Sequence, residues 1–172
     1  MTQRVASVSR TTRETDIRCT LSLDGQGEAR VNTGLGFLDH MLTALAKHGR
    51  LNLELRAEGD LCVDDHHTVE DCALVLGEAL EKALGDKAGV ARFGHAYVPL
   101  DEALARAVVD LSGRPWPVVN LGLRRDRLGD VSCENLTHFM NSLALSGHFT
   151  LHVDLLRGDN DHHRVEAAFK AL

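Results

Sequence analysis

The 172-residue sequence predicts an α+β protein made of two similar halves. Segments with alternating apolar and polar residues, typical of half-buried strands, are interspersed with segments whose apolar residues recur at helical spacing. The order of these segments repeats from about Gly89 onward. A His-His-x-x-Glu motif also occurs once in each half, at residues 66–70 and 162–166. We therefore expect residues 1–88 and 89–172 to form two α+β repeats that pack as one compact domain.

The first half begins with predicted strands. The segment "RVASVSR" (4–10) favours a strand, and "TDIRCTLSLDG" (15–25) alternates Ile17, Cys19, Leu21 and Leu23 with polar residues. The following segment "GEARVNTG" (27–34) is expected to be the hairpin partner of 15–25. The pattern predicts three strands before the first helix.

A helix is predicted for "LDHMLTALAKHG" (38–49), with Asp39 as a possible N-cap and Gly49 at its end. The segment "RLNLELRAEG" (50–59) alternates again and predicts a strand. A second helix is predicted for 68–86, where six apolar residues share one face. These are Val69, Cys72, Ala73, Leu76, Leu80 and Leu84.

The second half follows the same order. The segment "ALARAVVDLSG" (103–113) matches 16–25, with Arg106 and Gly113 in place of Arg18 and Gly25. The segment "WPVVNLGL" (116–123) predicts a strand, and the prolines of "RPWP" suit a sheet edge or a bend. A helix at 134–147, a strand at 148–156 and a helix at 161–172 complete the repeat, with "RRDRLGD" (124–130) as an insertion.

The histidines keep register between the halves. His138 lies 98 residues after His40, because 138 − 40 = 98. The offset is 96 for 162 − 66, for 163 − 67 and for 166 − 70. A two-residue deletion in the second half reconciles these offsets, so the motif is repeated because the fold is repeated.

Composition narrows the function classes. The formal net charge of −6 offers no basic surface for nucleic acid or an anionic membrane, so a small molecule is the expected partner. No apolar run approaches the roughly 20 residues of a membrane span, and residues 1–15 lack the apolar centre of a signal peptide. The four cysteines form no C-x-x-C pair and suit reduced, buried thiols. We expect a cytoplasmic protein.

The histidine motifs suit metal binding. Adjacent histidines on a helix point about 100° apart, so His66 and His67 are expected to serve two different ions. The glutamate that follows can approach either ring from the same face. With one further helix histidine in each half, the chain offers six imidazoles and two carboxylates, or three histidines and one glutamate for each ion. Such a set leaves coordination positions open for substrate, and it suits zinc, iron or manganese.

Each motif also has an ordinary structural interpretation. A single histidine on an amphipathic helix is usually a surface or hydrogen-bonded residue, but repetition in register favours ligands. His95, His148 and His152 have no such repeat and are expected to be structural or solvated. His48 precedes the helix-ending glycine, where it can interact with the helix C-terminus or face the site.

Several charged residues are candidates for substrate binding. Arg92, Arg114 and Lys170 suit a phosphate or carboxylate, although each could be a surface charge and Lys170 could pair with Glu166 four residues earlier. Glu14 lies in "RTTRET", between two predicted strands. Asp101 and Glu102 could form a solvated turn or support a metal ligand.

Four segments together resemble the imidazoleglycerol-phosphate dehydratase family over essentially the whole chain. They are "GLGFLDHMLTALAKHG", "DDHHTVEDCALVLGEAL", "RFGHAYVPLDEALARAVVDLSGRP" and "DNDHHRVEAAFKAL". The resemblance implies two halves, each with a roughly four-stranded sheet and helices on one face, as in the ribosomal protein S5 domain 2-like fold. It also implies two Mn²⁺ ions in each active site and a cage-like homo-oligomer of 24 subunits with active sites between subunits.

The resemblance implies a reaction and roles for individual residues. The family removes water from imidazoleglycerol phosphate to give imidazoleacetol phosphate in histidine biosynthesis. Glu14 matches an acid–base glutamate that contacts substrate, and Arg92, Arg114 and Lys170 match substrate-holding residues, with His48 a further candidate. The matched metal ligands are His40, His66, His67, Glu70, His138, His162, His163 and Glu166.

The family usually continues beyond the segment that matches "FKAL" (169–172) into a tail with a Ser/Lys phosphate-binding motif. We expect a chain without that tail to form the metal site but to bind phosphate poorly. Two other classes remain as alternatives. A dinuclear metallohydrolase would not need an imidazole in its substrate. A non-catalytic metal store would need a helical bundle, which the alternating strands contradict.

Overall fold

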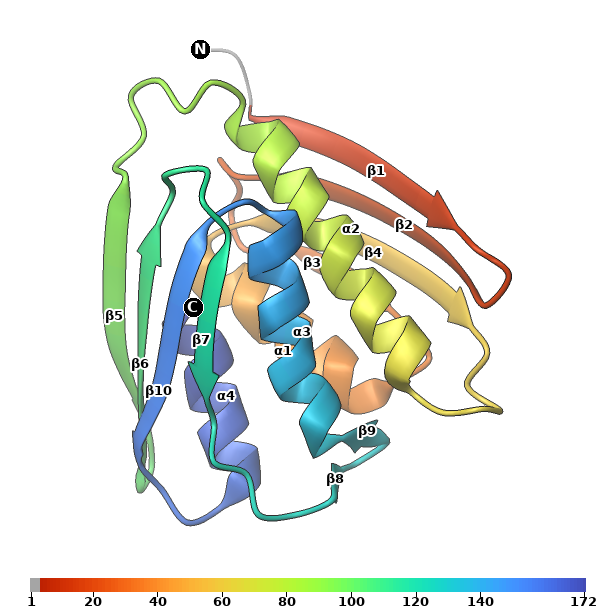
Figure 1. Ribbon diagram of the computed structural model, residues 1–172, viewed down its shortest axis with the longest axis vertical. Coiled ribbons are helices and arrows are strands. Elements are labelled where there is room, and N and C mark those ends of the chain that lie inside the picture. The colour runs from red at the N-terminus through yellow and green to blue at the C-terminus, as the bar shows by residue number, and fades with distance from the viewer. Residues whose placement is uncertain (1–3) are drawn as a thin grey trace.

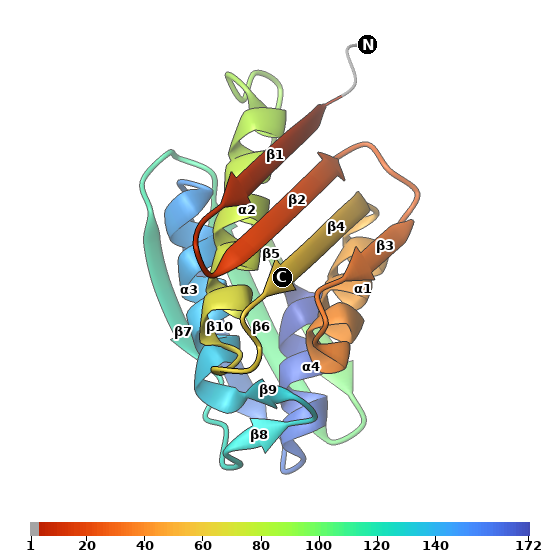
Figure 2. The same ribbon diagram turned by 90° about the vertical axis from the view of Figure 1, so that its right-hand side faces the viewer.

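The computed structural model describes residues 4–172, in which two four-stranded sheets lie on the outside and four helices lie between them (Figures 1 and 2). The first half contains β1 (Val5–Thr11), β2 (Thr15–Ser22), β3 (Ala29–Asn32), α1 (Gly36–Gly49), β4 (Asn52–Gly59) and α2 (His66–Leu84). The second half contains β5 (Phe93–Leu100), β6 (Ala103–Asp110), β7 (Trp116–Asn120), β8 (Arg127–Leu128), β9 (Val131–Ser132), α3 (Cys133–Ser146), β10 (Thr150–Arg157) and α4 (Asp161–Ala171).

The two sheets have the same topology. Their strand orders are β1-β2-β4-β3 and β5-β6-β10-β7, so each strand has a counterpart in the other half. Helices α1 and α2 pack on the first sheet, α3 and α4 pack on the second, and α2 packs against α3. The predicted α+β fold with two similar halves is confirmed. The expected boundary between residues 88 and 89 falls in the connection between α2 and β5.

The predicted hairpin between residues 15–25 and 27–34 is wrong. Strand β2 pairs with β1 on one side and with β4 on the other, both antiparallel, so both of its edges are occupied. Strand β3 instead pairs parallel with β4, and α1 connects the two strands. Alternation shows that a segment is a strand but does not identify its partner, and parallel pairing needs a crossover helix. Strands β7 and β10 repeat this arrangement around α3.

The predicted cap of α1 is also wrong. The helix begins at Gly36 after Leu35, so Asp39 lies within the first turn, where its carboxylate accepts hydrogen bonds from the backbone and hydroxyl of Thr33. The backbone amides of Gly36 and Phe37 instead donate to the carboxylate of Asp130. Because Asp130 lies in the β8–β9 turn, the second half caps the first helix of the first half.

The alternating and helical patterns identify the core. The side chains of Ile17, Cys19 and Leu21 on β2 are buried, as predicted, while the intervening residues of the strand are exposed or half-buried. Three of the four cysteines are buried and Cys62 is exposed; all four are free. Burial raises the pKa of the Cys19 thiol to about 12, which suits a structural side chain.

The inserted segment and the proline-containing segment have defined places. Residues 124–130 contribute to the short β8–β9 hairpin, which lies beside the start of α3 (Figure 2). Strand β7, which contains Pro117, is an edge strand as predicted. No helix among residues 4–172 is both long and apolar enough to cross a membrane.

Candidate metal centre

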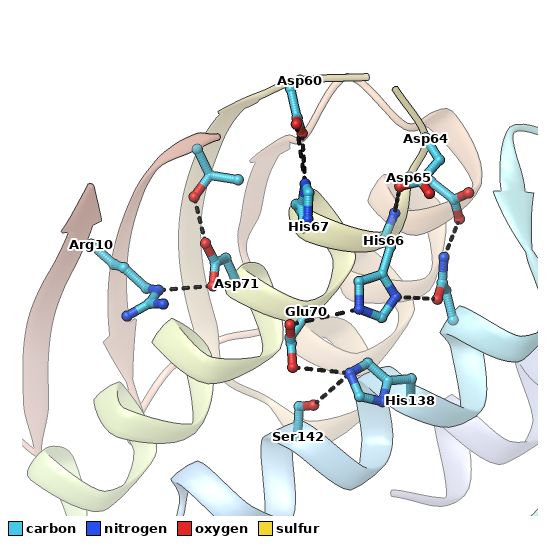
Figure 3. Close-up of polar contacts among 12 residues, drawn as sticks. Arg10, Asp60, Asp64, Asp65, His66, His67, Glu70, Asp71, His138 and Ser142 are labelled. Carbon is cyan, nitrogen blue, oxygen red and sulfur yellow. Dashed lines mark hydrogen bonds and ion pairs between the residues drawn. The ribbon is translucent and has the colours of Figure 1, made fainter. Parts of the chain in front are cut away.

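Two groups of possible metal ligands lie at the helix layer. We call His66, Glu70 and His138 the α2 cluster, because α2 supplies two of its members and α3 supplies the third. The carboxylate of Glu70 lies 3.0 Å from Nε2 of His138 and 3.8 Å from Nε2 of His66 (Figure 3). The two imidazole rings are stacked, with centroids 5.0 Å apart. Three ligand atoms therefore converge on one small region.

The second group is the equivalent α4 cluster, formed by His162 and Glu166 of α4 and His40 of α1. One oxygen of Glu166 lies 3.1 Å from Nε2 of His162 and 3.2 Å from Nε2 of His40. Each residue of a cluster offers one nitrogen or oxygen as a ligand atom, and in each cluster these atoms all lie within 4.8 Å of one another. Two imidazoles and one carboxylate at this spacing suit a divalent transition metal and leave positions open for substrate.

Each cluster combines the two halves of the chain. The α2 cluster takes its histidine–glutamate pair from the first half and His138 from the second, whereas the α4 cluster does the reverse with His40. Helix α2 packs against α3 and α1 packs against α4, which brings these residues together. Neither half alone can form either cluster.

The α2 cluster is supported by a chain of buried polar groups. The Asn135 amide donates from Nδ2 to Asp65, so its oxygen faces Nδ1 of His66 at 3.0 Å. Because a carboxylate can only accept from the amide, the proton of His66 must lie on Nδ1 and donate to Asn135. The lone pair on Nε2 of His66 then faces Glu70, as a metal ligand requires.

Asp65 stays ionised although its side chain is only 3% exposed. Burial would raise the pKa of this carboxyl group, but hydrogen bonds from Asn135 and Ser132 outweigh it and lower the pKa. The backbone and hydroxyl of Ser132 both donate at 2.7 Å. Asp65 therefore ties the start of α2 to the start of α3.

The α4 cluster has different neighbours. The ring of His162 packs edge-on against Phe37, with centroids 5.2 Å apart. The second oxygen of Glu166 lies 2.7 Å from Nζ of Lys170. Burial would raise the pKa of Glu166, but hydrogen bonds from Lys170 and His40 outweigh it and lower the pKa to about 2. The predicted i,i+4 pairing of Lys170 with Glu166 is confirmed.

The second histidine of each motif points away from its cluster. Nδ1 of His67 lies 3.0 Å from Asp60, and Nδ1 of His163 lies 2.8 Å from Glu102. The adjacent rings are nearly perpendicular, at 71° in the first motif and 87° in the second. The structure thus brings together six of the eight predicted ligands and directs His67 and His163 elsewhere.

Glu14 lies close to His67, in the turn between β1 and β2. The pKa of His67 is raised chiefly by its hydrogen bond to Asp60, and the charges of Asp60, Glu14 and Asp64 add to the shift. The backbone amide of Asp60 donates to the carbonyl oxygen of Glu14, and Thr15 beside it donates to the buried carboxylate of Asp71. The exposed Glu14 side chain is therefore carried on a well-anchored turn.

The other predicted substrate residues are spread over the molecule. Arg92 binds Asp110 through two hydrogen bonds, and Arg114 lies 3.7 Å from the same carboxylate. Arg92 precedes β5, whereas Glu102 follows it, so the eight residues of the strand place them about 25 Å apart. His48 lies two helical turns, about 12 Å, from His40. A single chain brings only Lys170 to a cluster.

The residues that support the clusters were not predicted as site residues. Asp65 and Asp161, each the residue before a His-His pair, could have been found from the repeat because both halves contain "DHH". Asp161 is buried and accepts hydrogen bonds from the backbone amides of Arg124 and Arg125. Asn135 carries no repeated signal, since its counterpart 98 residues earlier is Phe37.

Comparison with known proteins is consistent with this geometry. The family profile described as imidazoleglycerol-phosphate dehydratase matches residues 33–172. The chain is 62% identical over 169 residues to a Phytophthora nicotianae protein of that name, covering 98% of this chain but 37% of that protein. It is 53% identical over 194 residues to a Trichoderma harzianum protein of the same name, covering 98% of this chain and 93% of that protein.

A crystal structure of imidazoleglycerol-phosphate dehydratase from Staphylococcus aureus subsp. aureus N315 superposes with a TM-score of 0.87. Its sequence is 40% identical, and the superposition covers 97% of this chain and 92% of that chain. The similarity therefore extends over both halves and both clusters.

Proposed function

The chain belongs to the imidazoleglycerol-phosphate dehydratase family, and from this premise we propose that it removes water from D-erythro-imidazoleglycerol phosphate to give imidazoleacetol phosphate in histidine biosynthesis. It is then a hydro-lyase. We further propose that each active site uses two Mn²⁺ ions. The observation that carries this proposal is the pair of equivalent clusters, each with two imidazoles and one carboxylate.

The residues present fit such ions by their chemistry. Imidazole nitrogens accept divalent transition metals, and the two carboxylates favour the harder members of that series, such as Mn²⁺. The α2 and α4 clusters would hold the ions, and His67 and His163 would add the remaining ligands. Bound ions would supply Lewis acidity and a fixed template for the imidazole ring of the substrate.

Proton transfer is the difficult part of the reaction, because the carbon next to the ring carries no activating carbonyl group. We assign this transfer to Glu14, which is exposed beside His67 on the anchored β1–β2 turn. A rigid turn that presents a carboxylate at a fixed position is what general acid–base catalysis needs. The expelled hydroxyl group leaves as water after it receives a proton.

The positions of the candidate phosphate-binding residues support an active site shared between subunits. Lys170 lies beside the α4 cluster, but Arg92 and Arg114 lie at the opposite end of the second sheet from Glu102 and His163. This separation from Glu102 and His163 suits an active site to which another copy of the chain contributes the two arginines. We therefore propose a homo-oligomer with active sites between subunits, and assign it 24 copies as in the expectation from the family.

The cysteines support a cytoplasmic location. All four are free, and Cys62 is exposed to solvent. Exposed thiols without disulfides are typical of reducing compartments.

The test is turnover of imidazoleglycerol phosphate by metal-free protein before and after addition of Mn²⁺, followed by ultraviolet absorbance. We expect activity only with the ion, and a fall in kcat of about 100-fold or more for Glu14→Gln. Absence of turnover by Mn²⁺-loaded protein that carries the Ser/Lys phosphate-binding tail expected from the family would rule out the dehydratase function. Hydrolysis of a phosphate ester that lacks imidazole would instead favour a metallohydrolase.

A second variant tests the ligand assignment. His67→Ala is expected to lower both Mn²⁺ occupancy and assembly, because this histidine points away from its own α2 cluster toward a site completed elsewhere. Occupancy can be measured by metal analysis and assembly by mass photometry. Unchanged values for both would contradict a metal-bearing interface at His67.

A further inference from the structure

The two histidines that point away from the clusters share one kind of support. Nδ1 of His67 faces the carboxylate of Asp60 at 3.0 and 3.2 Å, as Figure 3 shows, and Nδ1 of His163 faces the carboxylate of Glu102 at 2.8 Å. An ionised carboxylate only accepts hydrogen bonds, so each ring must carry its proton on Nδ1. In the neutral ring, which is the form that binds a metal, Nε2 then keeps its lone pair.

The supporting carboxylates come from positions that the repeat does not relate. Asp60 follows β4, whereas Glu102 lies in the β5–β6 turn. By the offset of 88 that relates Arg106 to Arg18, the first-half counterpart of Glu102 is Glu14. The two halves therefore place a carboxylate against Nδ1 of the second histidine, but they do so with residues that are not counterparts in the repeat.

We propose that Asp60 and Glu102 are positioning residues that hold His67 and His163 in the Nδ1–H tautomer and present Nε2 to a metal ion. This inference rests on the proposed metal-dependent function. Nε2 of His163 lies 3.8 Å from the carboxylate of Asp101, which is too far for a hydrogen bond and leaves the nitrogen open. The arrangement is a carboxylate–histidine–metal relay in which the protein supplies the first two members.

The surroundings of the two carboxylates differ in a way that makes the proposal testable. The second oxygen of Glu102 accepts from the backbone amides of Asp159 at 3.2 Å and Asn160 at 2.9 Å. In Glu102→Gln the amide oxygen must stay with these two donors, so the NH₂ group faces Nδ1 of His163. Because that NH₂ group donates, it moves the ring proton to Nε2 and removes the metal ligand.

Asp60 lacks this constraint. Both of its carboxylate oxygens face Nδ1 of His67, and among residues 4–172 its side chain accepts no backbone amide. In Asp60→Asn the amide can therefore turn its oxygen toward Nδ1 and keep the tautomer. The same acid-to-amide change should be harmful at Glu102 and nearly neutral at Asp60.

The experiment titrates metal-free protein with Mn²⁺ and measures affinity by isothermal titration calorimetry. We expect Glu102→Gln to raise the Kd about 10- to 100-fold. Glu102→Ala, which leaves both tautomers accessible, should raise it less, and Asp60→Asn should stay within about twofold of wild type. Glu81→Gln is the matched control, because Glu81 lies 2.8 Å from Nδ1 of His148 and should leave Mn²⁺ affinity unchanged.

Thermal unfolding of the metal-free variants separates misfolding from loss of a ligand. Glu102→Ala loses the acceptor for two backbone amides and should be less stable than Glu102→Gln, although it binds Mn²⁺ better. Wild-type affinity in Glu102→Gln, or equal losses in Glu102→Gln and Asp60→Asn, would overturn the positioning role alone. A wild-type protein that binds no Mn²⁺ would overturn both this role and the proposed function.

Discussion

In the first half, Nδ1 of His66 donates to Asn135, which is held by the buried carboxylate of Asp65. In the second half the equivalent His162 packs against the ring of Phe37, and Lys170 pairs with the neighbouring Glu166. The α2 cluster is thus organised by a polar chain behind its histidine. The α4 cluster is organised by an aromatic ring and an added positive charge.

The repeat preserved the candidate ligands without preserving the residues that support them. Position 135 corresponds to position 37 and position 170 to position 74, so asparagine replaces phenylalanine and lysine replaces leucine. Two clusters with the same three candidate ligands can then differ in how the histidine tautomer is held and in local charge. Both properties affect the affinity for a metal ion.

The largest effect is expected from the aspartates that precede the two His-His pairs. Asp65→Ala leaves the donors of Ser132 and Asn135 unpaired, and Asp161→Ala leaves the buried guanidinium of Arg164 without its partner. We expect each to lower the free energy of unfolding by about 3 to 5 kcal/mol in denaturant titrations of metal-free protein at fixed concentration.

The same two variants should differ in metal binding. Asp65→Ala releases Asn135 and with it the orientation of His66, so Mn²⁺ affinity should fall about tenfold or more. Asp161 accepts from Arg124, Arg125 and Arg164 rather than from a group that contacts the His162 ring. Asp161→Ala should therefore bind Mn²⁺ more tightly than Asp65→Ala under conditions where both are folded. Equal affinities would show that the polar chain does not orient His66.

A smaller effect is expected at Asp71, whose second-half counterpart is Ala167. The Asp71 carboxylate accepts from Arg10 at 2.8 Å (Figure 3). It also accepts from Thr15, which connects α2 to the turn that carries Glu14. Asp71→Ala should lower the free energy of unfolding by about 2 kcal/mol, because Arg10 can return to water but the buried Thr15 hydroxyl loses its carboxylate acceptor. Turnover should fall as well, since Glu14 becomes less fixed.

The control for Asp71→Ala is Arg4→Ala, which removes an exposed ion pair with Asp24. Arg4 directly precedes β1, the strand that carries Arg10. Exposed ion pairs contribute little to stability, so both the free energy of unfolding and turnover should change little. Loss of stability in Asp71→Ala with unchanged kcat would mean that Asp71 is purely structural.

The sequence predicted the fold well where periodicity decides structure. Alternation identified most of the strands but missed β5, β8 and β9. Helical spacing identified the four helices, and repetition in register identified which histidines are exceptional. It could not identify the partner of β3, because pairing depends on the crossover through α1 rather than on local pattern. It could not predict the hydrogen bonds of Asn135 or Asp130 either, since their partners lie about 70 and 94 positions away in the chain.

The smallest effect is expected at Lys170. The pKa of Glu166 is lowered to about 2 from an ordinary value of 4.5, so this carboxylate stabilises the folded metal-free protein above about pH 4.5 and loses that contribution as the pH falls toward 2. Lys170→Leu copies the leucine found at position 74 and removes the main partner that lowers the pKa. The free energy of unfolding should drop by about 1 kcal/mol at pH 6, since His40 and His162 still face the carboxylate. The free energy of unfolding should also fall less steeply between pH 4.5 and 3.

The reciprocal Leu74→Lys places a lysine beside Glu70 and should make the free energy of unfolding in this range more dependent on pH. Identical pH profiles for wild type and Lys170→Leu would show that the added charge does not distinguish the α4 cluster from the α2 cluster.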